Sequence, residues 1–252
     1  MKERVDKLLA DQGIARSRTH AQALIMAGQV CIGDKLVKKS SEEYPIETQF
    51  RLKEGAANKY VSRGGEKLEG ALLESKLSVE GFEALDIGIS TGGFTDCLIQ
   101  NGVKSVIGID VGHNQLAWKI RNEPKVKAYE GINAREPLTK LVLTPVDLVV
   151  IDVSFISLTL ILPQAFKVLK DGGYLLALVK PQFEVKKEEV GKGGIVKDPL
   201  LHEEVQEKIK KFCTGLGLMQ ARTFSSPIEG TDGNKEFFIF GHKLRWDSSH
   251  TP

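Results

Sequence analysis

A glycine-rich stretch that follows an apolar segment is the part of this sequence best suited to binding a ligand. Residues 86–95 read Asp-Ile-Gly-Ile-Ser-Thr-Gly-Gly-Phe-Thr, and a second apolar segment, residues 105–109, ends at Asp110. In parallel sheets, a glycine-dense turn lets the backbone approach an adenosine-containing ligand, and an acid after the next strand hydrogen-bonds the ribose. A purely structural turn would explain the glycines but not the acid.

The same loop favours S-adenosylmethionine over a dinucleotide. It does not read GxGxxG, and the pyrophosphate of a dinucleotide would need the backbone amides of that motif. A sulfonium cofactor carries no phosphate and fits better. The residues expected to contact this cofactor are Asp86, Gly88, Ser90, Thr91, Gly92, Gly93, Phe94, Asp110, Val111 and Asn133.

Four charged residues from distant parts of the sequence could carry out a reaction beside that cofactor. A Lys–Asp–Lys–Glu group suits methylation of a ribose 2′-hydroxyl, a poor nucleophile that must lose its proton as it attacks the methyl group. A lysine accepts that proton only where burial or a neighbouring cation lowers its pKa. We expect Lys180 to be the base and Asp152 its partner, with Lys67 and Glu236 as the pair that tunes the base and orients the substrate. Any one of these residues alone could instead belong to a surface ion pair.

Strand and helix patterns alternate along the part of the chain that must position these residues. Strands are predicted at 84–87, 105–109, 126–129, 146–151, 174–179, 220–224 and 237–240, and helices at 62–75, 95–100, 114–121, 158–169 and 202–216. This alternation predicts an α/β fold with a doubly wound, mostly parallel seven-stranded sheet, closed by a hairpin that makes the last strand antiparallel. It is the class I Rossmann-like methyltransferase fold.

This topology predicts that the four charged residues meet. Ligands bind at the carboxyl ends of parallel strands. Asp152 follows the fourth predicted strand and Lys180 follows the fifth. Glu236 precedes an antiparallel strand, whose start lies at the same edge of the sheet. Lys67, on the helix before the first strand, can join them.

Two further features near this edge could contact a substrate. Phe155 comes three residues after Asp152 and could stack on a base turned towards the site. Residues 183–199 are rich in Lys, Glu and Gly, and we expect them to form a mobile lid, an RNA-contacting loop or a solvated excursion.

The first 58 residues predict a separate small α+β domain. Two short helices, a hairpin that turns at Gly33 and Asp34, and a last strand at 50–52 fill it, and a linker at about 54–61 leads to a second domain at 62–244. Residues 245–252 are expected to be a tail. All of the formal net charge of +2 lies in the first domain, which has ten Lys and Arg against eight Asp and Glu.

This first domain resembles the S4-type (alpha-L) RNA-binding motif of a small-subunit ribosomal protein, tyrosyl-tRNA synthetases and pseudouridine synthases. The matching residues are 4–10, 13–18 and 23–30. The resemblance implies that the domain grips structured RNA mainly through phosphate and shape contacts. The implied contact residues are Arg4, Arg16, Arg18, Lys35, Lys38 and Lys39, each of which alone could be part of a solvated basic face.

Longer motifs in the rest of the chain resemble the TlyA family, also called hemolysin A. They cover residues 62–68, 86–96, 151–158, 178–184 and 230–236, in the order found in the family. The family combines an S4-type domain with an FtsJ-like methyltransferase domain, and characterised members methylate cytidine 2′-hydroxyls in ribosomal RNA through a Lys–Asp–Lys–Glu tetrad. By motif, this tetrad falls on the four charged residues named above. One departure is Tyr60, where some members carry a tryptophan.

The cysteines and the apolar runs of the sequence argue against several other classes of protein. The three cysteines are far apart and form no CxxC pair, which argues against a disulfide framework or a zinc site. The first residues lack a signal-peptide core, and the most apolar run, 146–151, is too short to span a membrane. We therefore expect a cytoplasmic monomer without a metal, whose partner is ribosomal RNA or a ribosomal subunit. A cytolysin, which would need an export signal and a spanning element, and a non-catalytic RNA-binding factor are the alternatives.

Overall fold

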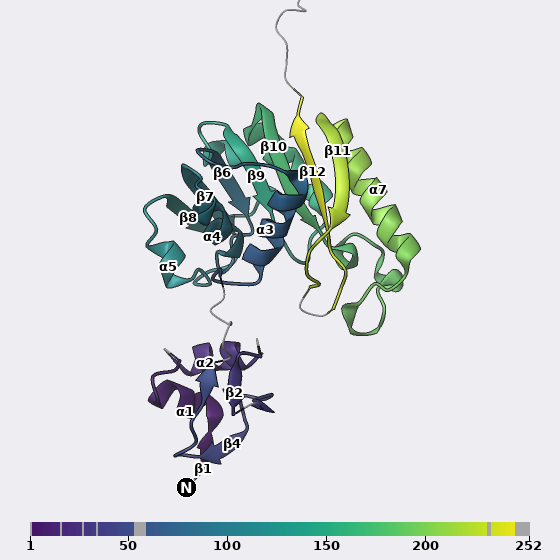
Figure 1. The fold of residues 1–252 in the computed structure, drawn as a ribbon. Coiled ribbons are helices and arrows are strands. Elements are labelled where there is room, and N and C mark those ends of the chain that lie inside the picture. Colours follow the sequence, from purple (N-terminus) through teal and green to yellow (C-terminus); the bar gives the residue numbers. More distant parts are fainter. Residues whose placement is uncertain are drawn as a thin grey trace, which may run out of the picture. The chain divides into compact units, whose positions relative to one another are not determined.

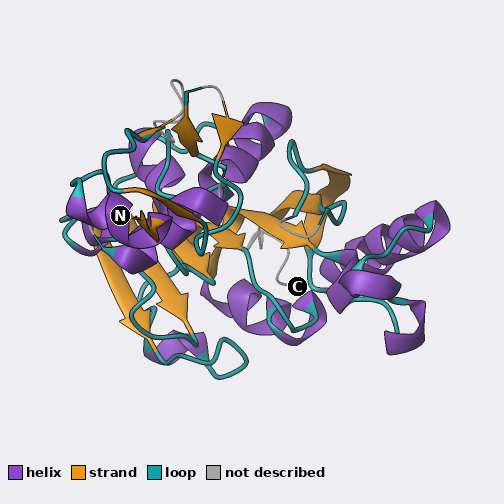
Figure 2. Ribbon diagram, turned by 90° about the horizontal axis from the view of Figure 1, so that it is seen from below, coloured by secondary structure: helices purple, strands orange, loops and turns teal. Residues whose placement is uncertain are grey.

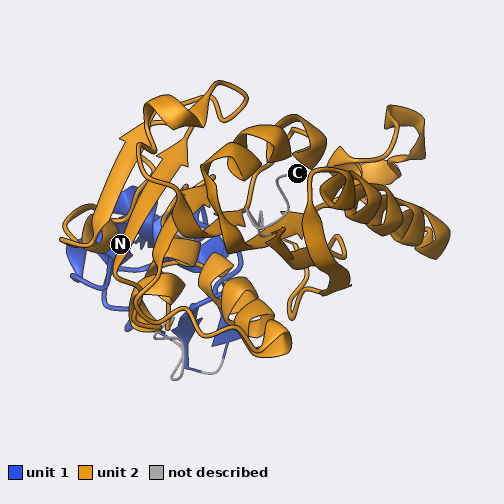
Figure 3. Cartoon of the chain, turned by 90° about the horizontal axis from the view of Figure 1, so that it is seen from above, with its two compact units in different colours: residues 1–58 blue, residues 59–252 orange. Residues whose placement is uncertain are grey.

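The computed structural model describes residues 2–15, 17–26, 28–33, 35–52, 59–230 and 233–244. The chain divides into two compact units, residues 1–58 and residues 59–252, which Figure 3 colours separately. Arg16, most of the expected linker at 54–61 and the expected tail at 245–252 lie outside the described residues.

The described residues of the first unit form two helices and two small sheets (Figure 1). Its elements are β1 (Lys2–Arg4), α1 (Val5–Asp11), α2 (Arg18–Met26), β2 (Val30–Ile32), β3 (Lys35–Leu36), β4 (Glu43–Pro45) and β5 (Arg51–Leu52). Ser17 caps the start of α2, because its hydroxyl accepts a hydrogen bond from the backbone N–H of His20 at 3.1 Å. The strands β2 and β3 pair in the antiparallel manner that the hairpin pattern predicts, and β5 pairs antiparallel with β2 as well. The pairings of β5 with β2 and of β1 with β4 were not predicted.

The second unit is built on one seven-stranded sheet in the order β11-β12-β10-β9-β6-β7-β8. Its strands are β6 (Glu83–Ile87), β7 (Ser105–Asp110), β8 (Val126–Glu130), β9 (Val146–Ile151), β10 (Leu169–Val179), β11 (Leu218–Ser225) and β12 (Phe237–Lys243). Neighbouring strands from β8 to β10 are parallel, and β12 runs antiparallel to both β10 and β11. This confirms the predicted fold class, including the antiparallel last strand.

Helices cover both faces of this sheet (Figures 1 and 2). They are α3 (Gly64–Ser75), α4 (Gly93–Gln100), α5 (Trp118–Arg121), α6 (Leu162–Val168) and α7 (Pro199–Gly215), with the single turns η1 (Leu138–Lys140), η2 (Leu158–Leu160), η3 (Pro181–Phe183), η4 (Lys187–Glu189) and η5 (Lys192–Gly194). Apolar side chains of α3 and α4 pack on one face, and those of α6 and α7 pack on the other. Because side chains alternate along each strand, both faces of the central strands are buried.

Two predicted helices differ from the observed ones for local reasons. The predicted helix at 158–169 divides into η2 and α6, since Pro163 lacks the N–H that a continuous helix would need there and instead lies in the first turn of α6. The predicted helix at 114–121 is reduced to one turn, because Asn114 has a φ of +58° and Ala117 is extended.

Among the described residues, no helix is both long enough and apolar enough to cross a membrane.

Candidate active site

The glycine-rich loop after β6 lies against the segment that follows β9. Gly88 has a φ of +88°, and a Cβ atom there would lie 2.2 Å from the backbone oxygen of Asp152. Gly93 begins α4, and its Cβ would lie 2.2 Å from the hydroxyl oxygen of Ser62. Glycine is required at both positions because only a residue without a side chain allows so close an approach. The loop therefore forms a cradle that packs against the backbone of Asp152 and the side chain of Ser62.

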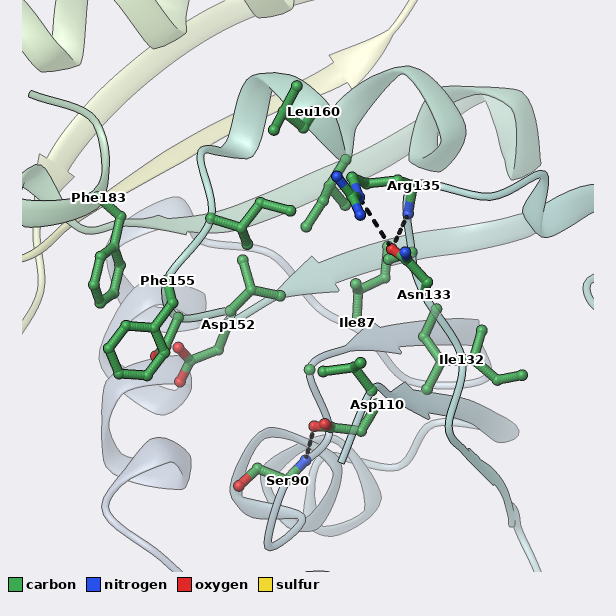
Figure 4. A pocket seen from close by; sticks show the side chains of 18 of the residues that line it. Ile87, Ser90, Asp110, Ile132, Asn133, Arg135, Asp152, Phe155, Leu160 and Phe183 are labelled. Atoms are coloured by element: carbon green, nitrogen blue, oxygen red, sulfur yellow. Dashed lines mark hydrogen bonds between the residues drawn. The ribbon is translucent and has the colours of Figure 1, made fainter. Parts of the chain in front are cut away.

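Asp110 at the end of β7 fixes the shape of this loop. Its carboxylate accepts hydrogen bonds from the backbone N–H groups of Ser90 at 2.9 Å and Gly112 at 2.7 Å. Figure 4 shows Asp110 and Ser90 joined at one side of a cavity, with Asp152 on the far side. The hydroxyl of Ser90 also lies 3.1 Å from the amide oxygen of Gln115, a residue that the sequence did not single out.

A cavity of about 1220 Å³ opens above the ends of β6, β7 and β9. A second cavity of about 380 Å³ adjoins it and shares part of its wall. Eight of the ten residues expected to contact the cofactor line one cavity or both: Gly88, Ser90, Thr91, Gly93, Phe94, Asp110, Val111 and Asn133. An open cradle, a carboxylate at the end of the second strand and apolar walls are what an adenosyl cofactor without phosphate needs, so these residues fit S-adenosylmethionine.

The other two expected cofactor residues line neither cavity. Gly92 has a φ of +94° and caps α4, where its Cβ would lie 2.9 Å from Ile120. Asp86 is fully buried below the loop and accepts a hydrogen bond from the hydroxyl of Thr95 at 2.6 Å. Burial, together with the nearby charges of Asp152 and Asp110, raises the pKa of Asp86 to about 7. Both residues thus support the loop from beneath.

The four charged residues form two ion pairs at this edge of the sheet. The ammonium of Lys67, on α3, lies 2.5 Å from the carboxylate of Glu236, which directly precedes β12. The ammonium of Lys180, directly after β10, lies 2.6 Å from Asp152 Oδ1. Lys67, Asp152 and Lys180 all line the smaller cavity together with the glycine-rich loop. Three of the four expected residues thus share the wall of one cavity, and Glu236 is linked to it through its pair with Lys67.

The Lys180 side chain has a further partner that the sequence did not reveal. It donates a hydrogen bond to the hydroxyl of Ser154 at 3.1 Å, so that Lys180 is held by two residues of the segment after β9. Asp152 Oδ1 is buried and accepts no hydrogen bond of regular geometry from the described residues. The contact of this oxygen with the Lys180 ammonium is therefore an ion pair.

Phe155 lines the larger cavity, and Figure 4 shows it between Phe183 and Asp152. The residue is 91 % exposed, and its φ of +65° is rare for a residue with a large side chain. Phe183, which the sequence did not single out, has its ring centroid 5.1 Å away and lines the same cavity. The pair presents an aromatic surface to the opening.

In the first unit, two of the expected RNA-contacting arginines share a carboxylate. Asp6 is buried and accepts hydrogen bonds from Arg4 Nε at 3.1 Å, Arg4 Nη2 at 2.9 Å and Arg18 Nη2 at 3.3 Å. The Arg4 guanidinium beside Asp6 holds the pKa of that carboxyl well below its usual range. The expected lysines Lys35, Lys38 and Lys39 are exposed.

Within the described part of the chain, no three His, Cys, Asp or Glu side chains gather in a way that could hold a metal ion.

Comparison with known proteins matches both units. Residues 60–243 fit the FtsJ-like methyltransferase family, and residues 3–48 fit the S4 domain. The 16S/23S rRNA (cytidine-2'-O)-methyltransferase TlyA of Mycobacterium tuberculosis is 40 % identical over 94 % of this chain and 88 % of its own. Hemolysin A of Brachyspira hyodysenteriae is 40 % identical over 93 % of this chain and 97 % of its own. The solved structure of a candidate hemolysin from Streptococcus thermophilus is 43 % identical, covers 99 % of this chain and 92 % of its own, and has a TM-score of 0.75.

Proposed function

The chain belongs to the TlyA (hemolysin A) family of FtsJ-like methyltransferases, and from that premise we propose that it methylates the 2′-hydroxyl of cytidine in ribosomal RNA. The observation that carries this proposal is the meeting of Lys180, Asp152 and Lys67 in the wall of one cavity with the glycine-rich loop. Such a group suits a reaction in which a hydroxyl must lose a proton beside a cofactor.

Each member of the group has a chemical role in this proposal. Lys180 accepts the proton of the 2′-hydroxyl, and Asp152, 2.6 Å from its ammonium, orients it and stabilises the charge that it gains. Lys67, held by Glu236 in a nearly buried ion pair, places a second cation in the same cavity and orients the ribose. The backbone cradle and Asp110 hold the cofactor against these side chains.

S-adenosylmethionine, when bound, supplies the activated methyl group. The negative charges that face this region from Asp152 and Asp110 suit a cationic sulfonium, and the apolar walls of the larger cavity suit an adenine ring. Phe155 and Phe183 offer a surface on which the target base could stack.

The first unit supplies affinity for RNA in this proposal. Its S4 domain carries the arginine pair held by Asp6, and guanidinium groups bind phosphate oxygens through paired hydrogen bonds. We propose that the protein acts as a monomer in the cytoplasm, where ribosomal RNA is found.

The test is methyl transfer from tritiated S-adenosylmethionine to ribosomal subunits that lack the modification. We expect label at a position that resists alkaline cleavage, and Lys180→Ala should lower the turnover about 10²- to 10⁴-fold, the usual contribution of a general base. Lys170→Ala is the matched control, because Lys170 forms a similar pair with Asp147 at 2.8 Å at the opposite edge of the sheet. Wild-type turnover in a folded Lys180→Ala variant would refute the assignment of the base.

Wild-type protein that binds the cofactor yet labels no RNA would contradict the proposed activity itself. Lysis of red cells by purified, cofactor-free protein would instead support the cytolytic activity after which the Brachyspira hyodysenteriae relative is named.

A further inference from the structure

We propose that Glu184 is a positioning residue for this reaction, because its carboxylate fixes the segment after β9 relative to Lys180. The inference rests on the proposed function, since Glu184 would serve the reaction by holding Asp152 and Phe155 in place. Glu184 lines neither cavity among the residues described, so it acts through other residues.

Glu184 joins the segments that follow two neighbouring strands. It comes four residues after Lys180, at the end of η3, and its side chain is only 1 % exposed. Its Oε1 accepts a hydrogen bond from the backbone N–H of Leu158 at 2.7 Å, and its Oε2 accepts one from the hydroxyl of Ser157 at 2.7 Å. Both donors follow Asp152 closely in the sequence. A single buried carboxylate thus links the segment that carries Asp152 to the segment that carries Lys180.

The long helix α7 completes this link. Lys208 donates hydrogen bonds to Glu184 Oε2 at 3.3 Å and to the backbone oxygen of Glu184 at 2.9 Å. A buried carboxylate is costly unless it is paired and hydrogen-bonded, and here a cation and two further donors meet those needs. Glu184 is therefore stable in a place from which it can hold the neighbouring segment.

The segment from Asp152 to Ser157 needs such an anchor because it has no regular secondary structure of its own. The backbone N–H of Asp152 donates to the oxygen of Ile87 at 3.0 Å, which fixes the start of the segment to the sheet. Between the two ends lies Phe155, whose positive φ is strained and whose side chain is almost fully exposed. Strain of this kind persists only where surrounding contacts impose it, and the contacts from Glu184 impose it from the far end.

The cofactor loop has a separate anchor. Asp110 holds Ser90 and Gly112, and neither of these residues contacts Glu184 through a hydrogen bond. Residues 153–157 also line the larger cavity, so loss of the Glu184 carboxylate should disturb the base and its partner more than cofactor binding, whose loop keeps its own anchor.

Anchoring by Glu184 also changes the interpretation of residues 183–199. A second buried polar residue, Asn234, accepts a hydrogen bond from the backbone N–H of Val196 at 3.0 Å and donates one to the oxygen of Gly194 at 2.9 Å. The segment is tied to the fold at both ends, Glu184 and Val196, which favours a fixed brace over a mobile lid, one of the three forms expected from its composition.

The experiment combines amide hydrogen exchange with kinetics on Glu184→Ala and Glu184→Gln in the full chain. In Glu184→Ala we expect exchange in residues 153–158 to rise about tenfold or more, because the Leu158 amide loses its acceptor. We expect kcat to fall by up to about 100-fold, the scale of a displacement of roughly 1 Å, with a much smaller change in the S-adenosylmethionine dissociation constant. Glu184→Gln can still accept from Leu158 and should keep kcat within about threefold of wild type.

Asp147→Ala is the matched control, since Asp147 accepts from the backbone N–H of Glu83 at 2.9 Å and from Lys170 at 2.8 Å at the other edge of the sheet. It should leave exchange at 153–158 and kcat unchanged.

Wild-type exchange and wild-type kcat in folded Glu184→Ala would overturn the inference. If that variant does not fold, Glu184→Asp takes its place, since the shorter carboxylate cannot reach both donors, and wild-type values there would overturn it equally. The exchange result stands without any methylation, so it separates this inference from the proposed function.

Discussion

The ammonium of Lys67 lies 2.5 Å from the carboxylate of Glu236, although 169 positions separate the two residues in the sequence. Their side chains are only 11 % and 3 % exposed. A lysine that is held this way in the cavity wall keeps one ammonium position in the absence of substrate. The pair thus connects α3, before the first strand of the sheet, to the loop before β12.

Removal of one partner from this pair should be costly for stability. Glu236→Ala leaves the Lys67 ammonium buried without its carboxylate, and we expect the free energy of unfolding to fall by about 3–5 kcal/mol. The double variant Lys67→Met/Glu236→Ala should recover part of that loss. Lys104→Ala, which breaks an exposed pair with Glu83, should cost less than about 1 kcal/mol. Urea denaturation measures all three. Equal losses for the single and double variants would contradict a paired role.

The close approach of Gly88 to Asp152 makes a second prediction. A Cβ atom at Gly88 would meet the backbone oxygen of Asp152 at 2.2 Å, so Gly88→Ala must displace either the cofactor loop or the segment after β9. We expect S-adenosylmethionine affinity, measured by calorimetry, to fall about tenfold or more. Gly81→Ala is the control, because Gly81 also has a positive φ, +75°, but has no atom within 4 Å of the added methyl group. It should cost about 1 kcal/mol of stability and leave the affinity unchanged.

Sequence patterns predict the sheet well because its strands are apolar runs bounded by turn residues. The predicted directions of these strands then place Asp152, Lys180 and Glu236 at one edge of the sheet. Contacts that depend on a single backbone amide have no such pattern. Glu184 stands directly after Phe183 in a charged segment, and nothing in the sequence indicates that its carboxylate meets the N–H of Leu158. The pairing of β1 with β4 escaped prediction for a related reason, since three-residue strands carry too little alternation to be distinguished from turns.

Burial of Asp86 predicts a characteristic dependence of stability on pH. The pKa of this carboxyl is raised from 3.8 to about 7, so between these values the native state holds a proton that the unfolded chain has released. The free energy of unfolding should therefore fall as pH rises through this window, by about 4 kcal/mol in total at roughly 1.4 kcal/mol per pKa unit. Asp86→Asn has no such proton to lose, and its unfolding, followed from pH 4 to 8, should lack this decline. Parallel curves for the variant and the wild type would exclude Asp86 as the source.

The arginine pair at Asp6 predicts how RNA binding responds to salt. Arg4 and Arg18 are 41 % and 55 % exposed, so both can still reach phosphate while Asp6 fixes their guanidinium groups. We expect Arg4→Gln and Arg18→Gln each to weaken binding to ribosomal RNA and to reduce the slope of log K against log salt by about 0.7–0.9. Filter binding across salt concentrations measures the slope. Lys104→Gln, on the second unit and 68 % exposed, should leave it unchanged; equal slopes for all three variants would disprove a specific role for the pair.

Phe155 should show opposite effects on stability and activity. The residue is 91 % exposed and its backbone has a φ of +65°, so its conformation costs about 1–3 kcal/mol without contributing a buried surface. Phe155→Gly relieves this strain and should raise the melting temperature, whereas Phe155→Ala removes the ring and keeps the strain.

If the ring stacks on the target base, both variants should lower kcat/KM for RNA by about 5- to 150-fold, the equivalent of 1–3 kcal/mol of stacking, without changing cofactor affinity. Leu143→Ala is the control, because Leu143 is 84 % exposed and lines neither cavity. Unchanged kcat/KM in both Phe155 variants would show that the strained ring serves another purpose.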